Sequence, residues 1–364
     1  MDATFFELIR VSLGVQNSLS HIPLEKEWNR LYQMAENQAV IGVCFAGLQK
    51  LVADADNGFT TIGMSEIQYF NWMGEAFYIQ SKNEKINQQC LDLQKKLQSD
   101  GLRSCILKGQ GVAKVYGSQL GCLRQSGDID IWIDASREKV LDYCMQIKPT
   151  KEFDQKHIHF HYFEDTDVEA HWIPVKRFNP IWNRTLGKYF NSERNRQFSN
   201  MDCDLCVPTA DFQLVHQLLH VYSHYVYEGV GIRQVMDLYF AQNACIEGRD
   251  KVLKLFNDLG ITNFVSATQW VLSYVFKIPS EQLLCEPNAK EGQKLLNEIM
   301  IGGNFGQHDK RNHVKGETFM QRFFRRWGRM FRMFRFDPLG TLLMPFIRLK
   351  LELWMRRMRR LYHV

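Results

Sequence analysis

The sequence contains few of the features that mark fibrous, disulfide-rich or membrane-spanning proteins. It has only nine prolines and 24 glycines among 364 residues, which excludes a collagen-like or proline-rich chain. Its nine cysteines are odd in number and irregularly spaced, so we expect a reducing compartment rather than a disulfide scaffold. No apolar run approaches the roughly 18–20 residues that cross a bilayer, and the start, MDATFFELIR, lacks the basic region of a signal peptide. These absences predict a cytoplasmic protein.

The remaining composition is that of an ordinary globular protein with an uneven charge. Apolar residues make up 45% and charged residues 23% of the chain, whose length predicts two domains or one large one with additions. The net charge is +5, but residues 319–364 alone carry +10, which leaves −5 for the other 318 residues. An anionic partner is therefore expected at the C-terminal tail.

The spacing of apolar residues divides the chain into four regions. Residues 1–100 have helical periodicity throughout. Residues 101–175 alternate short strands with short helices, which is typical of a small mixed sheet covered by helices. Residues 176–318 are mainly helical again, and residues 319–364 form a basic amphipathic tail. We therefore predict an α+β fold in which N- and C-terminal helical regions flank a small mixed β-sheet.

Local signals set some of the element boundaries. Ser65 is a typical helix cap, and Gly101 is a typical stop for the helix that follows it. Ser136 is expected to cap a second helix. Residues 174–208 are expected to be irregular because prolines interrupt them, and residues 301–318 are expected to form a polar linker. The expected strands cover residues 102–107, 129–133, 157–163 and 168–173.

Two acidic residues, Asp128 and Asp130, mark the strand expected over residues 129–133. Side chains two positions apart in a strand point the same way, so both carboxylates share one face. Paired carboxylates repel each other unless a cation lies between them, and their hard oxygens suit Mg²⁺ that also binds phosphates. Glu169, on a later strand, would add a third carboxylate, and three carboxylates can hold two metal ions.

These acids belong to an ordered set of short motifs. The motifs are Lys108-Gly109-Gln110-Gly111, Arg124, Asp128-Ile129-Asp130 and Glu169-Ala170-His171-Trp172. Their sequence order resembles that of the DNA polymerase β-type nucleotidyltransferase superfamily, and it is most similar to the bacterial uncharacterised nucleotidyltransferase family. The resemblance implies Mg²⁺-dependent transfer of a nucleoside monophosphate from an NTP to a hydroxyl or amine acceptor, with release of pyrophosphate.

The resemblance also implies a role for each motif. Asp128, Asp130 and Glu169 would hold two Mg²⁺ ions, and Glu169 would accept the proton of the attacking hydroxyl. The nucleotide would bind at Lys108, Gly109, Gln110, Gly111 and Arg124, with the glycines allowing close backbone approach and the cations contacting phosphates.

One position departs from the superfamily pattern. Gln110 follows Gly109, where serine or glycine is usual. The departure and the basic tail allow a second hypothesis, a non-catalytic binding or regulatory protein that has the same fold. The implied partners are an NTP and an acceptor that is a small molecule, a protein or an RNA.

Several histidines have spacings that metal sites also use. His157, His159 and His161 alternate along one expected strand, and we interpret them as a polar face beside an anionic substrate rather than a zinc site. His161 and His171 are expected near Glu169. On an expected helix, His216, His220 and His224 recur every four residues, and we interpret them as packing residues.

Two further patterns are less specific. Cys203 and Cys206 form a single CxxC, which we interpret as turn residues rather than a zinc or redox site. Arg233 and Asp237 are four residues apart, so an ion pair within one helix is expected, with contact from Arg233 to the nucleotide as the alternative.

The tail, residues 319–364, interleaves arginine with phenylalanine, tryptophan and methionine. Packing against the body of the protein is the leading interpretation. Binding to an anionic membrane surface and binding to nucleic acid are the alternatives, because both surfaces attract clustered arginines and accept aromatic side chains.

Overall fold

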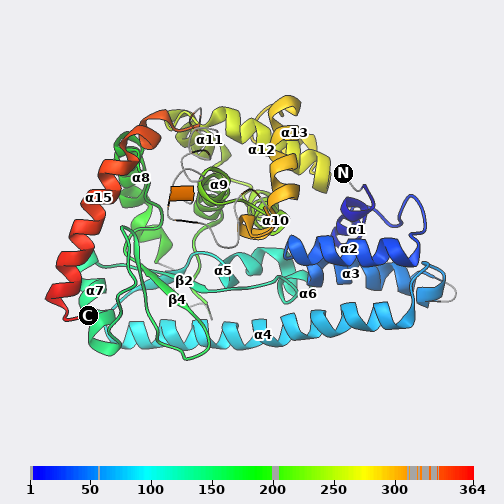
Figure 1. Cartoon of the computed structure of the whole chain (residues 1–364), viewed down its shortest axis with the longest axis horizontal. Coiled ribbons are helices and arrows are strands. Elements are labelled where there is room, and N and C mark those ends of the chain that lie inside the picture. Colours follow the sequence, from blue (N-terminus) through cyan, green and yellow to red (C-terminus); the bar gives the residue numbers. More distant parts are fainter. Residues whose placement is uncertain are drawn as a thin grey trace.

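The computed structural model describes residues 3–55, 58–198, 205–309 and 336–364, with isolated positions at 311, 318, 320, 321, 328 and 334. Its N-terminal part is helical, as the sequence predicts. The longest helix passes beneath the other N-terminal helices and then beneath the sheet (Figure 1). These helices are α1 (Ala3–Leu13), α2 (Glu25–Asn37), α3 (Ile41–Ala53) and α4 (Glu66–Ser99), with a short η1 (Gly58–Thr60) between the last two.

The predicted start and stop of α4 are confirmed. The Ser65 hydroxyl accepts a hydrogen bond from the backbone amide of Gln68, and the Gln68 side chain accepts one from the Ser65 amide. These two bonds satisfy amides that the first helical turn leaves unpaired. The helix then continues for 34 residues and ends before Gly101, whose φ is +74°.

The sheet has four strands in the order β1-β2-β4-β3, and β2 and β4 are parallel, whereas the two outer pairs are antiparallel. The predicted strand at residues 129–133 is confirmed to the residue, and the other three are shorter than expected. Ser136 caps α7 by accepting a hydrogen bond from Lys139, as predicted. The elements of this region are β1 (Ser104–Ile106), α5 (Gln110–Ala113), η2 (Lys114–Tyr116), α6 (Gly117–Gly121), β2 (Ile129–Ile133), α7 (Arg137–Ile147), β3 (His157–His159) and β4 (Val168–His171).

One face of the sheet is mainly apolar, with Ser104 as its one polar residue within the paired strands. Ile129, Ile131 and Ile133 of β2 are buried there in a compact core, as the alternation of the strand predicts. The second half of α4 and one side of α7 complete this core. The opposite face, which carries the acidic residues, is therefore left for the C-terminal helices.

The C-terminal helices share one large core with the N-terminal helices. Arg10 of α1, for example, donates a hydrogen bond to the Val275 carbonyl at 2.9 Å. The division of the chain at residues 100, 175 and 318 stays a prediction. The helices are α8 (Pro180–Gln197), α9 (Ala210–Tyr227), α10 (Ile232–Ala244), α11 (Arg249–Asp258), α12 (Thr262–Phe276) and α13 (Ala289–Gly302), with short η3 (Ser280–Gln282) and η4 (Asn304–Gly306).

Two expectations about the chain are wrong. Residues 174–208 are not irregular, because α8 occupies 18 of them. Pro180 stands at the first helical turn, where its missing amide costs nothing, and the Asn179 side chain caps the amides of Ile181 and Trp182. The prediction that residues 301–318 form a linker is wrong for residues 303–309. This segment packs against the start of α10.

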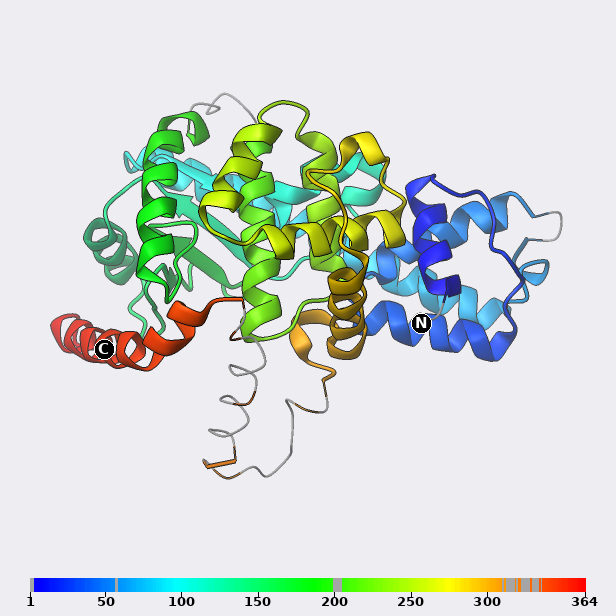
Figure 2. The ribbon, with the colours of Figure 1, turned by 90° about the horizontal axis from the view of Figure 1, so that it is seen from above.

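The tail ends in a helix that packs on the sheet domain. Helix α15 (Pro338–Leu361) places Trp354, Met355 and Met358 against the smaller core, so the packing interpretation is confirmed for this part. Figure 2 shows α15 at the opposite end of the molecule from α1–α3. Most of residues 319–335, which the tail prediction also covers, lie outside the described residues.

The eight cysteines in the described ranges are all free, and Cys203 of the CxxC pair lies outside them. Within the same ranges, none of the helices combines the length and the apolar character that crossing a membrane would need.

Candidate functional site

The polar face of the sheet brings together residues from three strands. The register pairs Asp130 of β2 with Glu169 of β4, and Glu169 with His159 of β3. Two residues farther along, Trp132, His171 and His157 form a second row on the same face. Adjacent strands are about 4.8 Å apart, so side chains paired in this way are neighbours.

Asp130, Glu169 and His171 form the centre of this face. His171 Nε2 lies 2.9 Å from Asp130 Oδ1 and 3.2 Å from Glu169 Oε2. One ligand atom from each of the three residues lies within 4.8 Å of the other two. Burial lowers the pKa of His171, but the two carboxylates outweigh burial and raise it above its ordinary value. The His171 imidazole thus bridges the carboxylates of Asp130 and Glu169.

Lys108 supplies a second cation to the same centre. Its ammonium lies 2.6 Å from Asp130 Oδ1. Burial opposes its charge, but Asp130, Glu169 and Asp128 together raise the pKa of Lys108 above its ordinary value. Burial likewise opposes the charge of Asp130, and Lys108 lowers the pKa of Asp130 in spite of it. Both groups are therefore ionised at neutral pH.

Asp128 lies at the margin of this centre and is half-buried. The Asp130 carboxylate and burial raise the pKa of Asp128, while Lys108 opposes the rise. The charges of Asp130, Lys108 and Glu169 all contribute to this shift. The prediction that Asp128 joins Asp130 and Glu169 in one metal site stays a prediction.

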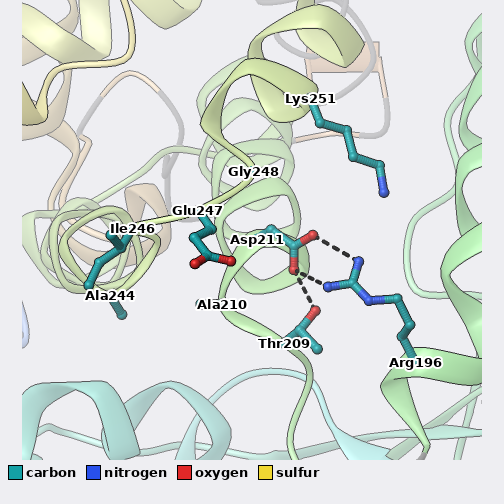
Figure 3. Close-up of a pocket in the computed structure, with 9 residues that line it drawn as sticks. All are labelled: Arg196, Thr209, Ala210, Asp211, Ala244, Ile246, Glu247, Gly248 and Lys251. Carbon is teal, nitrogen blue, oxygen red and sulfur yellow. Dashed lines mark hydrogen bonds and ion pairs between the residues drawn. The ribbon is translucent and has the colours of Figure 1, made fainter.

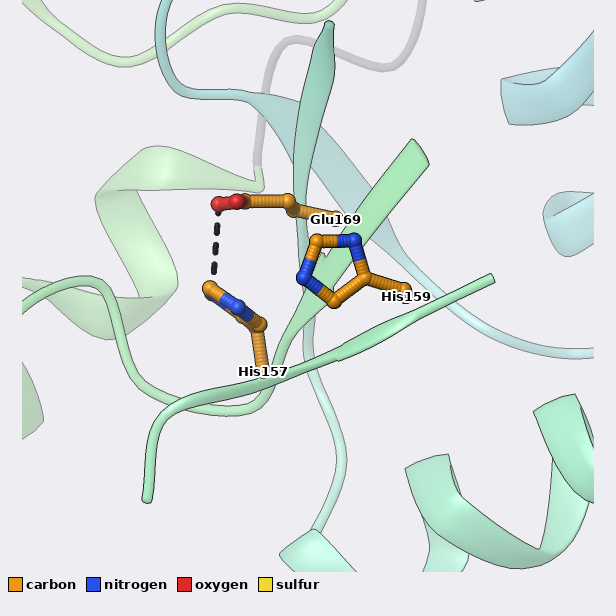
Figure 4. Close-up of side chains that lie close together, drawn as sticks. All are labelled: His157, His159 and Glu169. Carbon is orange, nitrogen blue, oxygen red and sulfur yellow. Dashed lines mark ion pairs between the residues drawn. The ribbon is translucent and has the colours of Figure 1, made fainter. Parts of the chain in front are cut away.

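Glu169 also faces two histidines of β3. Figure 4 shows the imidazoles of His157 and His159 on the same side of the sheet as the Glu169 carboxylate. His157 Nδ1 lies 3.1 Å from Glu169 Oε2, and ligand atoms of all three residues fall within 4.8 Å of one another. Burial raises the pKa of Glu169, but contacts with His157 and His171, then the charge of Lys108, lower it below its ordinary range.

Helix α9 covers the polar face of the sheet. Phe212 near its start stacks on Trp132 of β2, with ring centroids 5.6 Å apart. His216, one turn farther along, is buried, and burial followed by the charge of Lys108 lowers its pKa to about 3. His220 and His224 continue the same side of the helix, and burial lowers the pKa of each. This histidine row therefore forms the wall opposite the acids.

The turn before α5 depends on its two glycines. Gly109 has φ +56°, which residues with a side chain rarely adopt. A Cβ on Gly111 would lie 2.4 Å from the Ile106 carbonyl oxygen, so no larger residue fits. Gln110 between them is buried: it donates to the Asn83 carbonyl at 3.1 Å and accepts from the Ser126 hydroxyl at 2.6 Å. The residue that departs from the family pattern therefore braces the turn against α4 and the loop before Asp128.

Arg124 forms a buried ion pair with another residue of the fold. Its Nε and Nη2 each lie 2.7 Å from one carboxylate oxygen of Asp237 on α10. Tyr116 also donates its hydroxyl hydrogen bond to Asp237, at 2.6 Å. The ion pair expected between Arg233 and Asp237 is therefore replaced by one with Arg124. Contact between Arg124 and a phosphate stays a prediction.

Arg233 is a buried cation whose described contacts are not carboxylates. It donates to the Gln125 carbonyl at 2.7 Å and to Asn304 Oδ1 at 3.3 Å, and its guanidinium lies 5.2 Å from the centroid of the Phe305 ring. Burial, then the charge of Arg124, lowers the pKa of Arg233 to about 10, while Asp237 and Asp128 oppose that shift. The Arg233 side chain is thus affected by the charges of Asp237 and Asp128, but its described hydrogen bonds are not made to either carboxylate.

The segment carrying Phe305 is fixed by contacts between backbones. A Cβ on Gly229 would lie 2.4 Å from Gly306 Cα. Phe305 itself has φ +54°, a conformation that costs on the order of 1 kcal/mol for a residue with a side chain. Its ring packs edge-on against His224, with centroids 4.9 Å apart. Strained residues of this kind cluster at functional sites.

The sequence prediction and the structure differ for some site residues. His161 faces Glu152, at 3.7 Å, and belongs to neither group that contains Glu169. Lys156, which the sequence reading missed, lies 3.9 Å from Glu169 Oε2. Phe305 was also missed, and only its position between glycines could have signalled a special conformation.

A surface pocket of about 550 Å³ opens at the other end of α9. Figure 3 shows Arg196 and Thr209 both directed at Asp211. The remaining cation, Lys251, pairs with Glu193. Because both of its cations and Asp211 are paired within the fold, this pocket offers a ligand less than the polar face of the sheet does.

Comparisons with known proteins support the same region. No curated protein and no solved structure matches the chain. The model of one family, described as uncharacterised nucleotidyltransferase, matches residues 25–277, which are more than half of the chain and include every site residue named above except Asn304–Gly306. The chain therefore belongs to the uncharacterised nucleotidyltransferase family.

Proposed function

We propose that the protein transfers a nucleoside monophosphate from an NTP to a hydroxyl or amine acceptor, with release of pyrophosphate, and that the transfer depends on Mg²⁺. One observation carries the proposal. The carboxylates of Asp130 and Glu169 come from neighbouring parallel strands and offer ligand atoms within 4.8 Å of each other, and Asp128 stands two residues before Asp130 in the chain. Family membership supplies the reaction class.

The donor set fits a hard divalent cation. All the candidate ligands from these three residues are carboxylate oxygens, which Mg²⁺ prefers. Glu169 Oε2 is buried and has no hydrogen-bond partner within the described part of the chain. Such an atom is costly to bury unless a cation approaches it. Asp128, Asp130 and Glu169 would hold the metal, which supplies activation of the attacking oxygen and charge neutralisation at the phosphates.

The other residues of the site would bind and orient the nucleotide. Lys108, already held beside Asp130, would present its ammonium to a phosphate as a point charge. Arg233 would contact the nucleotide from the opposite side, since its described partners leave its charge uncompensated. Arg124 would act as a positioning residue through Asp237.

Glu169 suits metal binding better than proton acceptance. Its contacts with His157 and His171 oppose burial and keep its pKa below the ordinary range, so it has little affinity for a proton. The expectation that Glu169 accepts the proton of the acceptor therefore has less support than its role as a ligand.

We further propose that α15 attaches the protein to an anionic membrane surface. Four apolar residues spaced along one side of α15 are 58–72% exposed: Leu342, Phe346, Leu349 and Leu353. This side lies opposite the side that packs on the sheet domain. Exposed cations flank the apolar stripe, namely Lys350, Arg356 and Arg357. An apolar stripe between cations is the pattern by which helices lie in the headgroup region of anionic bilayers.

The proposed transfer is tested with labelled NTPs. The protein is incubated with Mg²⁺, each of the four α-labelled NTPs, and small-molecule, protein and RNA fractions of a lysate. Label is expected in one fraction, with pyrophosphate released. Asp130→Asn should reduce the transfer by at least about 1,000-fold, because the metal loses a charged ligand. Asp92→Asn, an exposed change on α4, is the matched control and should retain full transfer.

Two results would contradict the proposal. The first is a wild-type protein that binds none of the four nucleotides at millimolar concentration with Mg²⁺ present. The second is an Asp130→Asn variant that transfers label as fast as the wild type. The first result would favour a non-catalytic binding protein.

A further inference from the structure

The polar face of the sheet contains a second group of potential ligands, with nitrogen as well as oxygen donors. His157 and His159 of β3 and Glu169 of β4 each offer one atom within 4.8 Å of the other two. Both imidazoles and the carboxylate project from the same face of the sheet (Figure 4). The group lies beyond the aspartates, and it shares only Glu169 with the proposed Mg²⁺ ligands.

The separations suit a small metal ion. A tetrahedral ion with bonds of about 2.1 Å holds its ligand atoms about 3.4 Å apart. His157 Nδ1 and Glu169 Oε2 are 3.1 Å apart without any change in the structure. His159, which is half-buried, has freedom to turn toward them. The preorganised pair thus needs only one side-chain adjustment.

Two buried atoms at this place are unsatisfied. His157 is 7% exposed, and neither its Nδ1 nor Glu169 Oε2 forms a hydrogen bond with any described residue, because their close approach has the wrong geometry for one. Leaving a buried polar atom unpaired costs about 1–3 kcal/mol.

The surrounding charges do not exclude a cation. The ammonium of Lys156 lies 3.9 Å from Glu169 Oε2, and its side chain is 30% exposed, so it can move away from an incoming cation. His171 contacts the same carboxylate oxygen at 3.2 Å and also holds Asp130. Because His171 lies between the two groups, it would fix the orientation of Glu169 for both.

We propose that His157, His159 and Glu169 form a binding site for a divalent transition metal of the Zn²⁺ class. Two imidazoles and one carboxylate favour Zn²⁺, Co²⁺ or Mn²⁺ over Mg²⁺, which prefers oxygen ligands only. Three protein ligands leave a fourth position open, as in zinc sites that bind water or a substrate oxygen. This site and the proposed Mg²⁺ site have only one ligand in common, Glu169.

The test measures metal binding directly on the full chain. After chelator treatment, the protein is titrated with Zn²⁺ against a chromophoric indicator, in about 10 mM Mg²⁺ to saturate sites made only of oxygen. One Zn²⁺ per chain is expected. Co²⁺ should give the visible absorption bands of a tetrahedral site with nitrogen ligands.

Variants separate this site from its neighbours. His159→Ala and His157→Gln should each weaken Zn²⁺ binding by at least about 100-fold. His161→Ala, on the same segment but facing Glu152, is the matched control and should bind as the wild type does. Asp130→Asn should keep the zinc while losing transfer, which distinguishes failure of this site from failure of the proposed function.

The proposal is overturned if the chelator-treated wild type binds no Zn²⁺ tighter than about 10 μM. It is also overturned if His159→Ala binds Zn²⁺ as the wild type does. Because His159 is half-buried, its truncation should leave the fold intact, and circular dichroism of the variant verifies this.

Discussion

The guanidinium of Arg124 and the carboxylate of Asp237 form a buried, two-bonded ion pair across 113 residues of sequence, with both bonds at 2.7 Å. Arg124 stands in the loop that leads into the strand of the acids, and Asp237 stands on α10. The pair therefore ties the loop before β2 to the C-terminal helices. Its side chains are only 4–5% exposed, so water contributes almost nothing to either charge.

Asp237→Ala should destabilise the protein by about 3–5 kcal/mol, because it leaves the Arg124 charge buried without a partner. Chemical denaturation of the variant measures the loss. Replacing both residues by apolar ones of similar volume, Arg124→Met with Asp237→Leu, should restore part of the stability. As a control, Asp258→Ala breaks the exposed pair with Lys254 and should cost no more than about 1 kcal/mol. A cost for Asp237→Ala as small as that of the control would contradict the buried role.

Acid should destabilise the fold through His216. Its pKa is lowered to about 3, by burial first, so the folded protein keeps it neutral while the unfolded chain protonates below about 6.5. The unfolded state then binds more protons, and stability falls as the pH drops from about 6.5 toward 3. At pH 5 the loss from this one residue is about 2 kcal/mol. His171 acts in the opposite direction, because its raised pKa favours the folded state until the pH rises through the folded value.

The measurement compares unfolding free energies at pH 7 and pH 5. His216→Gln removes the titrating group. The free energy of unfolding of this variant should therefore fall by about 2 kcal/mol less between pH 7 and pH 5 than that of the wild type. The difference is used because the substitution at a buried site also changes absolute stability. His21→Gln, an exposed change near α2, should keep the wild-type difference. Equal pH dependence in all three proteins would show that His216 is protonated in the folded state.

The α15 surface predicts binding to anionic vesicles. The intact chain should float with vesicles containing phosphatidylglycerol and should remain below with neutral vesicles, because the cations need a counter-charge. Leu349→Glu with Leu353→Glu should reduce binding by at least about tenfold, since each leucine contributes roughly 1.5–3 kcal/mol on leaving water. Ile246→Glu, at an even more exposed apolar residue outside α15, should have no effect.

The same preparation also tests the nucleic-acid alternative for the tail. Retention of an RNA oligonucleotide by the wild type, together with failure to float with either kind of vesicle, would overturn the membrane proposal. Salt should weaken vesicle binding, because screening acts on the exposed arginines.

Strand alternation explains why the site could be predicted in part. The alternation predicts that Asp128 and Asp130 lie on the face opposite the isoleucines. The later strand with the Glu-x-His pattern can then pair with β2 in only a few registers. Helix caps such as Ser65 could also be predicted from the sequence, because a cap depends on a hydrogen bond to an amide only three residues away. The convergence of Asp130 with Glu169 followed from these local rules once the strands were paired.

Other features depend on contacts that no local rule contains. Arg233 stands one helical turn from Asp237, yet the partner of Asp237 is Arg124, which reaches it only in the folded topology. The sequence does not predict the start of α8, because Pro180 interrupts the helical pattern, whereas its position in the first turn is compatible with the helix. The role of Gln110 depends on α4, which is distant in sequence.

The contact between Gly229 and Gly306 has a consequence for how the family can diversify. Gly229 and Gly306 touch through their backbones, with no side chain between them. The distance between Phe305 and the end of α9 therefore depends on the backbone alone. Point substitutions elsewhere in the segment leave that distance unchanged. Only a change in the length of either segment would alter how closely Phe305 packs against His224 at the end of α9.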